Sequence, residues 1–235
     1  VNHNIPDSVG VVLKTPVGTV VHTGDWKFDH TPVNERPADI ARLAELGRNG
    51  VALLVSESTD AEHEGHQISE QDVQKSLEGI FRAAQGRIIA ATFSSLLTRI
   101  QQLIWLSEQY GRKVAIEGTS MKQYVAVSQE LGYMKIKKGT LIESKTIGEH
   151  PDHRITVVCT GAQGEDRAVL MRIANNEHKN ISLKPADSII FSSSVIPGNE
   201  ATVQRLKDVL YKRAAHVYHY STMDIHAGGH AKRDE

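Results

Sequence analysis

Apolar and polar positions follow one pattern near the start of the chain and another after about residue 68. Near the start, apolar runs at 9–13 and 19–21 flank a turn at 16–18 that contains proline and glycine, which predicts a β-hairpin. Helical spacing of apolar residues predicts a helix over 38–46, and a continuous apolar run at 51–55 predicts a buried strand.

From Ser69 onward, helical periods alternate with short apolar runs, and Ser69 itself opens a capping-box-like sequence. The expected helices are 69–84, 94–110, 120–131, one ending near 175, and 200–213, and the expected strands are 87–92, 113–116, 154–160, 188–192 and 216–219. This alternation is typical of parallel strands joined by crossover helices. It predicts an α/β fold with a mainly parallel sheet and flanking helices.

The composition is that of an ordinary globular protein, with 40% hydrophobic and 23% charged residues in a chain of 235. A chain of this length forms either one large α/β domain or a small domain joined to a larger one. No apolar run approaches a membrane span, and Val1 begins no signal-peptide pattern, so we expect a cytoplasmic protein without membrane contact.

The chain has a single cysteine, Cys159, and 12 histidines. One cysteine excludes an internal disulfide and a cysteine-built zinc site, so a metal would need histidine and carboxylate ligands. The formal net charge of −1 provides no broad field for nucleic acid, so such contacts would be local. The densest basic stretches, 135–138 and 205–213, are explained as well by solvated surface charge.

Residues with metal-binding or acid–base chemistry stand at the ends of the predicted strands. His3 precedes the hairpin and Asp25 follows it, and an antiparallel return brings those two ends to one edge of a sheet. A chain-end histidine and a turn-forming aspartate explain the same residues. Glu57 follows the run at 51–55, where a structural turn or cap is the competing explanation.

Three strand-to-helix loops carry serine, threonine or glycine that would suit a phosphate. They are 92–95, which contains Ser94 and Ser95, 160–164 and 192–194. None matches a nucleotide-binding motif, so helix N-capping by the serine and threonine residues of these loops is the default prediction, and phosphate binding is the alternative.

Near the end of the chain, His226 and His230 flank a small-residue turn that contains Gly228. Such a turn lets the backbone approach a ligand while both imidazoles stay available to an oxyanion. Disorder close to the chain end is the alternative.

Taken together, these stretches resemble the ribonuclease J family, which are metallo-β-lactamase-fold nucleases with a β-CASP insertion. The matching stretches, in the family's order and over nearly the whole chain, are HNIPDS at 3–8, VHTGD at 21–25, EST at 57–59, ATFSS at 91–95, TGAQGE at 160–165, IPGNE at 196–200 and HAGGHA at 226–231.

The resemblance implies roles for individual residues. His3 is similar to a zinc-ligand histidine and Asp25 to the aspartate that bridges two zinc ions. Glu57 resembles an acid that supports a catalytic histidine, and His230 resembles that histidine, a general acid or phosphate contact. These four residues would form the part of the site that carries out cleavage.

The resemblance also implies that the loop with His226 and Gly228 contacts RNA phosphate, and we add Ser94 and Ser95 of the loop 92–95 as expected phosphate contacts. By the same resemblance, Gly228 stands at a position that is commonly serine in the family. One hydroxyl contact is therefore missing, and the backbone N–H of Gly228 would serve instead.

In the family, an H-x-H-x-D-H motif would come before Val1 and a further ligand histidine after Glu235, and neither is in this sequence. We therefore expect an internal part of a longer nuclease. The expected domains are a partial metallo-β-lactamase αββα domain at 1–67, a β-CASP domain at 68–230 and the return to the first domain at 231–235.

The function implied is a zinc-dependent ribonuclease of RNA processing and decay, rRNA included, that cleaves single-stranded RNA as a 5′-to-3′ exonuclease, an endonuclease or both. A complete site would hold two Zn²⁺ ions, and the full-length protein would be a homo-oligomer. This chain alone is expected to be inactive or to bind zinc weakly. The alternatives are a non-catalytic RNA- or phosphate-binding β-CASP module and an unrelated α/β nucleotide-binding domain.

Overall fold

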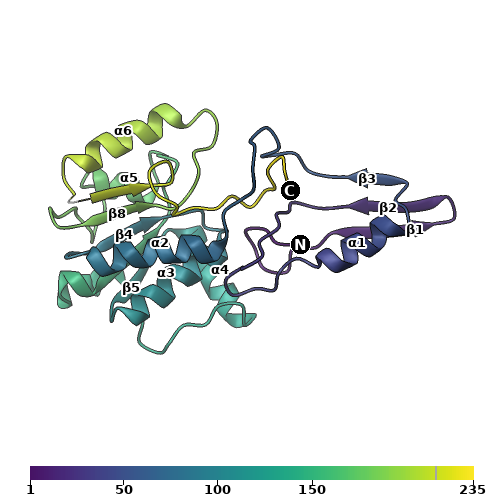
Figure 1. The fold of residues 1–235 in the computed structure, drawn as a ribbon. Helices are drawn as coiled ribbons and strands as arrows, with labels where there is room; N and C mark the ends of the chain where they lie inside the picture. The colour runs from purple at the N-terminus through teal and green to yellow at the C-terminus, as the bar shows by residue number, and fades with distance from the viewer. Residues whose placement is uncertain (215) are drawn as a thin grey trace. The chain divides into compact units, whose positions relative to one another are not determined.

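The structure is a computed structural model that describes residues 1–214 and 216–235. They form two compact units, which we call unit 1 (Val1–Asp72 with Ala227–Glu235) and unit 2 (Val73–His226). The predicted α/β fold with a mainly parallel sheet and flanking helices is confirmed (Figure 1). The assignment of 1–67, 68–230 and 231–235 to named domains stays a prediction.

A three-stranded sheet in the order β1-β2-β3 lies at the centre of unit 1. The elements of this unit are β1 (Val11–Thr15), β2 (Gly18–His22), α1 (Ile40–Arg48) and β3 (Leu53–Val55). β1 and β2 pair antiparallel with Val11 opposite His22, which confirms the predicted hairpin. β3 pairs parallel with β2, and the carboxylate of Asp39 caps α1 by accepting a hydrogen bond from the N–H of Arg42.

The strand predicted at 51–55 forms, but the prediction that it is buried is wrong. Leu53 and Leu54 are 53% and 60% exposed. Within the described residues β3 is an edge strand that pairs only with β2, and a groove of about 500 Å³ between α1 and the sheet leaves Leu54 uncovered. A continuous apolar run is typical of a strand covered on both faces, but the run does not encode what covers it.

The sheet of unit 2 has six strands in the order β6-β5-β7-β4-β8-β9, and every pairing is parallel. Its strands are β4 (Ile88–Ala91), β5 (Lys113–Glu117), β6 (Leu141–Ile142), β7 (Ile155–Cys159), β8 (Ser188–Phe191) and β9 (His216–His219). Ala91 lies opposite both Cys159 and Phe191, so three strands end level with one another. Because the strands run the same way, the loops 92–95 and 160–164 leave from one edge of the sheet.

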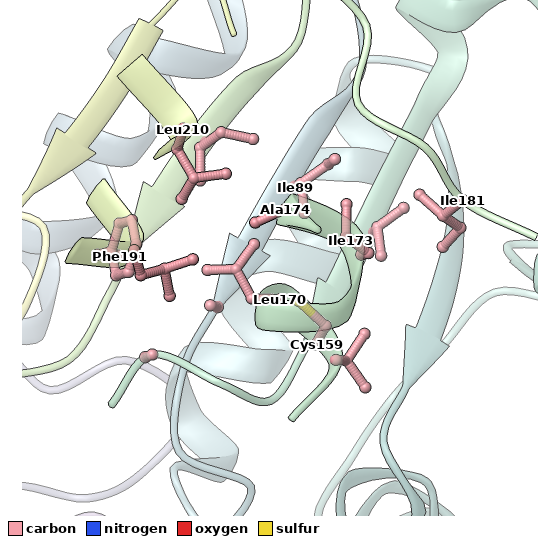
Figure 2. Packing of buried hydrophobic residues seen from close by; sticks show 14 of the residues in the cluster. Ile89, Cys159, Leu170, Ile173, Ala174, Ile181, Phe191 and Leu210 are labelled. Atoms are coloured by element: carbon pink, nitrogen blue, oxygen red, sulfur yellow. The ribbon is translucent and has the colours of Figure 1, made fainter. Parts of the chain in front are cut away.

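Helices cover both faces of this sheet (Figure 1). They are α2 (Glu70–Ala83), α3 (Leu97–Gln109), α4 (Thr119–Glu130), α5 (Val169–Ala174) and α6 (Glu200–Tyr211). Leu170 of α5 and Leu210 of α6 pack against Ile89 and Phe191 of the strands, all of them buried (Figure 2). None of the helices in the described residues combines the length and the apolar character needed to cross a membrane.

The sequence pattern missed three short elements, which lie between α4 and β7. They are β6 and the 3₁₀ helices η1 (Ser144–Glu149) and η2 (Asp152–Arg154). Each is too short to show a helical or strand period.

The helices that follow the loops at the sheet edge are not capped as predicted. The residues preceding α3, α5 and α6 are Leu96, Ala168 and Asn199, and none of the three makes a side-chain capping hydrogen bond. The prediction that serine and threonine of the loops cap these helices is wrong, because each helix begins further along the chain. At α2, by contrast, Ser69 Oγ accepts a hydrogen bond from the N–H of Gln71, as predicted.

A buried ion pair joins the starts of β4 and β8 in unit 2. Arg87 Nε and Nη2 donate to the two carboxylate oxygens of Asp187 at 2.9 and 2.6 Å, and Nη2 also donates to the carbonyl of Ser182. The N–H of Lys184 donates to the same carboxylate. The side chains of Arg87 and Asp187 are only 3% and 0% exposed, so each charge depends on the other for its compensation.

We expect Asp187→Ala to lower the free energy of unfolding by about 3–5 kcal/mol, because it leaves the guanidinium of Arg87 buried and uncompensated. Urea denaturation measures the loss. Asp152→Ala is the matched control: it removes the exposed pair with Lys184, and the expected cost is below about 1 kcal/mol. Equal losses in the two variants would contradict the analysis.

Candidate functional site

His3 and Asp25 lie close together in unit 1, where the chain enters and leaves the hairpin. His3 Nε2 is 3.8 Å from Asp25 Oδ2. The other ring nitrogen, His3 Nδ1, is 2.7 Å from the carbonyl oxygen of Gly229. A carbonyl only accepts hydrogen bonds, so Nδ1 is a donor, and Nε2 is the ring nitrogen that faces Asp25. A ring held in this way is oriented to bind a metal ion through Nε2.

The approach of Gly229 to His3 requires glycine. A Cβ atom at residue 229 would lie 2.6 Å from His3 Nδ1 and 2.6 Å from the side-chain amide of Asn4. Any larger residue would therefore push the histidine ring away from the carbonyl that orients it. The second glycine of the HAGGH sequence thus has a steric reason to be there.

His230 and Glu57 form a second contact in the same unit. His230 Nδ1 is 3.2 Å from Glu57 Oε1, and the rings of His230 and His3 meet edge to face with centroids 5.0 Å apart. The N–H of Thr59 donates to the other carboxylate oxygen, Glu57 Oε2, at 2.7 Å. One carboxylate oxygen of Glu57 therefore contacts His230, and the other stabilises the turn that contains Glu57 and Thr59.

The pKa of Glu57 reflects these contacts. Burial of the carboxyl group by itself would raise the pKa, but hydrogen bonds from Thr59 and the neighbouring His230 outweigh it and hold the pKa below its ordinary value. The group is therefore an anion at neutral pH. An anion in contact with Nδ1 favours a proton on that nitrogen and leaves Nε2 of His230 for chemistry.

Three side chains in unit 1 could hold a metal ion. One ligand atom each from His3, Asp25 and His230 lies within 4.8 Å of the others. Two nitrogens and a carboxylate oxygen are a donor set that suits zinc. The side chain of Asp25 is 59% exposed, so the group is open to solvent. The resemblance paired His230 with Glu57, and the structure adds that His230 also lies close to the two predicted ligands, His3 and Asp25.

The predicted phosphate-binding residues are divided between the units. Gly228 belongs to unit 1, whereas Ser94, Ser95 and His226 belong to unit 2. The N–H of Gly228 already donates to Gln67 Oε1 at 3.2 Å, so the phosphate contact expected of it would have to replace that bond. The ring of His226 packs edge to face on Tyr220.

The loops at the carboxyl edge of the unit 2 sheet are tied to one another. Gln163 Nε2 donates to the carbonyl of Ser194 at 2.7 Å, and Gln163 Oε1 accepts from the N–H of Ile196. Ser192 Oγ donates to the carbonyl of Ile225 and also contacts the guanidinium of Arg99, which is fully buried. Polar residues of these loops therefore fix the loops themselves rather than cap helices.

The sequence model of the family described as "Ribonuclease J, beta-CASP domain" matches residues 85–210. The chain belongs to the ribonuclease J family. Membership excludes the alternative of an unrelated α/β nucleotide-binding domain, and it agrees with the parallel sheet that this segment contains.

Curated relatives match over nearly the whole chain. Ribonuclease J of Thermus thermophilus is 43% identical over 233 residues, which are 99% of this chain and 40% of that protein. Ribonuclease J of Helicobacter pylori strain 26695 is 41% identical over 235 residues, which are 100% of this chain and 34% of that protein. The chain thus spans well under half the length of these relatives.

Among solved structures, a protein of unknown function from Enterococcus faecalis V583 has a similar fold. The TM-score is 0.62 at 16% identity, over 98% of this chain and 51% of that chain. At that identity the likeness concerns the fold alone.

Sequence reasoning missed two residues that shape the site, Gly229 and Gln67. Gly229 could have been found, because two adjacent glycines beside a histidine indicate a backbone that lies close to another group. Gln67 stands in a polar stretch without any motif, and its two contacts to the glycine loop are with residues more than 160 positions away, so nothing in the sequence pointed to it.

The lowered pKa of Glu57 leads to a prediction for Glu57→Gln. Since the pKa is depressed in the folded state, the stabilisation by this carboxylate is present above the unfolded value, about 4.3, and disappears as the pH falls through the folded pKa. We expect the variant to unfold more easily than wild type at pH 7 and to approach wild-type stability below about pH 4.

Urea denaturation across this pH range tests the expectation. The control is Glu64→Gln, because the side chain of Glu64 is 82% exposed and pairs only at the surface with Arg233. A loss for Glu57→Gln that stays constant at every pH would contradict the role of its charge.

Proposed function

We propose that this chain is part of a metal-dependent ribonuclease that hydrolyses phosphodiester bonds of single-stranded RNA in RNA processing and decay. The observation that carries the proposal is the line of contacts from Asp25 through His3 and His230 to Glu57 within unit 1. It combines metal-ligand donors with an acid–base pair, the two components that metal-assisted phosphodiester hydrolysis needs. The family and the names of the relatives support the same reaction.

The metal in this proposal is zinc, held in this chain by His3 Nε2 and Asp25 Oδ2. When bound, zinc would lower the pKa of a water ligand and offset negative charge on the phosphate oxygens. His3 is suited to the role because the carbonyl of Gly229 fixes its tautomer and its orientation. A complete site with two ions would need more ligands than these two residues supply.

His230 has the position of a proton donor in this proposal. Its Nδ1 contacts Glu57, so Nε2 is the atom that would deliver a proton to the leaving oxygen of the RNA. The contact with the carboxylate of Glu57 keeps the ring from turning and directs Nε2 away from Glu57. Glu57 itself is too engaged with Thr59 and His230 to serve as a second proton donor.

RNA would be held through its backbone, with Ser94, Ser95, His226 and Gly228 as contacts to phosphate. Recognition of this kind has little sequence specificity. We also propose a cytoplasmic location, which suits a chain whose one cysteine, Cys159, is buried and free. The choice between exonuclease and endonuclease cleavage and the homo-oligomeric state stay predictions.

We expect His230→Ala in the full-length protein to slow RNA cleavage by about 10²- to 10⁴-fold, the usual contribution of a positioned general acid. Cleavage of a 5′-labelled single-stranded RNA under single-turnover conditions measures the effect.

The matched control is His153→Ala, which removes an exposed histidine of η2. A full rate for His230→Ala would overturn the role of this residue. A wild-type protein that binds the RNA without cleaving it would instead favour the non-catalytic RNA-binding module.

We expect this chain by itself to bind zinc weakly, because two protein ligands do not hold a dinuclear centre. Dialysis against zinc-free buffer followed by elemental analysis should leave less than one ion per chain. His3→Ala should reduce zinc uptake during titration further, whereas His153→Ala should not change it. Two tightly held ions per chain after dialysis would contradict the prediction.

A further inference from the structure

Gln67 lies in the segment between β3 and α2, and its half-buried side chain reaches the backbone on either side of Gly229. Its Nε2 donates to the carbonyl of His230 at 2.9 Å, and its Oε1 accepts from the N–H of Gly228 at 3.2 Å. Nε2 also donates to Asp60 Oδ2 at 2.6 Å. All of these residues belong to unit 1.

The three partners leave only one orientation of the amide. Two of them, the carboxylate of Asp60 and the carbonyl of His230, accept hydrogen bonds, and the third, the N–H of Gly228, donates one. The flipped amide would place an oxygen against two acceptors and an NH₂ group against a donor. The nitrogen of Gln67 therefore faces Asp60, and the oxygen faces Gly228.

The segment 228–230 is consequently held from two sides. Gln67 binds the N–H of Gly228 and the carbonyl of His230, while the carbonyl of Gly229 between them binds Nδ1 of His3. A shift of this segment would move the ring of His230 and the partner that orients His3 together. Both candidate catalytic and metal-binding histidines thus depend on the same short stretch of backbone.

Gln67 also accounts for the glycine at residue 228. A Cβ atom there would lie 2.8 Å from Gln67 Nε2, so the amide occupies the space that a side chain at 228 would take. Asp60 in turn holds the amide in place, and its second oxygen contacts Nδ1 of His63 at 2.7 Å.

We propose that Gln67 is a positioning residue for His230, acting through the backbone of Gly228 and His230 and held in place by Asp60. The inference rests on the proposed ribonuclease function and adds one positioning residue to the proposed site. Gln67 itself contacts no reacting atom in this role. It sets the geometry from which His230 acts.

The decisive variant is Gln67→Glu, which keeps the size of the side chain and the acceptor for Gly228 but replaces the donating NH₂ with an oxygen. That oxygen would face the carboxylate of Asp60 and the carbonyl of His230, and the repulsion would displace the segment. At pH 8 we expect kcat of the full-length protein to fall ~10- to 100-fold, as for a misplacement of about 1 Å, with KM for RNA changed less than about twofold.

Two further variants separate positioning from a general loss of structure. Combining Asp60→Asn with Gln67→Glu restores a donor–acceptor pair between the two residues, so kcat should recover in part. Gln71→Glu adds the same charge on the exposed surface of α2 and should leave kcat unchanged.

Hydrogen exchange of the Gly228 amide, followed by NMR on this chain, tests the inference without cleavage. Gln67→Ala should speed that exchange by about tenfold or more, because it removes the acceptor of the N–H. Exchange that is unchanged in Gln67→Ala, or a wild-type kcat in Gln67→Glu, would overturn the inference. Absence of cleavage by the wild-type protein would overturn the proposed function instead. The exchange measurement would still show whether Gln67 holds the N–H of Gly228.

Discussion

The hydrogen bond between the imidazole of His3 and the carbonyl of Gly229 joins residues that are 226 positions apart in the chain. The rest of the candidate site depends on it. Because it fixes the proton on Nδ1, it leaves Nε2 free toward Asp25, and because Gly229 precedes His230, it brings the second histidine against the first. Without a side chain at 229 the two rings meet directly. One backbone carbonyl thereby sets the ring orientation of one histidine and the location of another.

The two units are stabilised in different ways. Unit 2 has a continuous parallel sheet with buried apolar residues on its helices and strands, and the guanidinium of its buried ion pair of Arg87 and Asp187 also donates to the carbonyl of Ser182. Unit 1 has a small sheet with exposed apolar side chains and gains much of its order from the last residues of the chain. The N–H of Ala231 donates to the carbonyl of Trp26, and the backbone of Lys232 forms an isolated parallel β-bridge with that of Asp60. Polar and backbone contacts therefore count for more in the unit that carries the candidate site.

Most helices and strands and part of the candidate site could be predicted from the sequence. The predictions that failed did so for physical reasons. The alternation of helical and strand periods gave the elements of unit 2, because each buries one face on a common sheet. The burial of β3 was mispredicted, since exposure depends on the layers around a strand and not on its own residues. The contact of His3 with Asp25 followed from the geometry of a hairpin. That of Glu57 with His230 came from resemblance alone, and Gln67 gave no signal, because it acts on backbone atoms whose position only the folded chain defines.

Unit 1 is discontinuous: all of unit 2 is inserted between its first 72 residues and its last nine. During synthesis, His3 and Asp25 leave the ribosome long before Gly229 and His230 exist. Closing a loop of that length around an unfolded segment is entropically costly, whereas an insert that has already folded brings its two ends to fixed positions. The contacts of His3 with Gly229 and His230 can therefore form only after the inserted unit has been synthesised. Until the inserted unit has folded, a nascent chain would keep His3 and His230 apart.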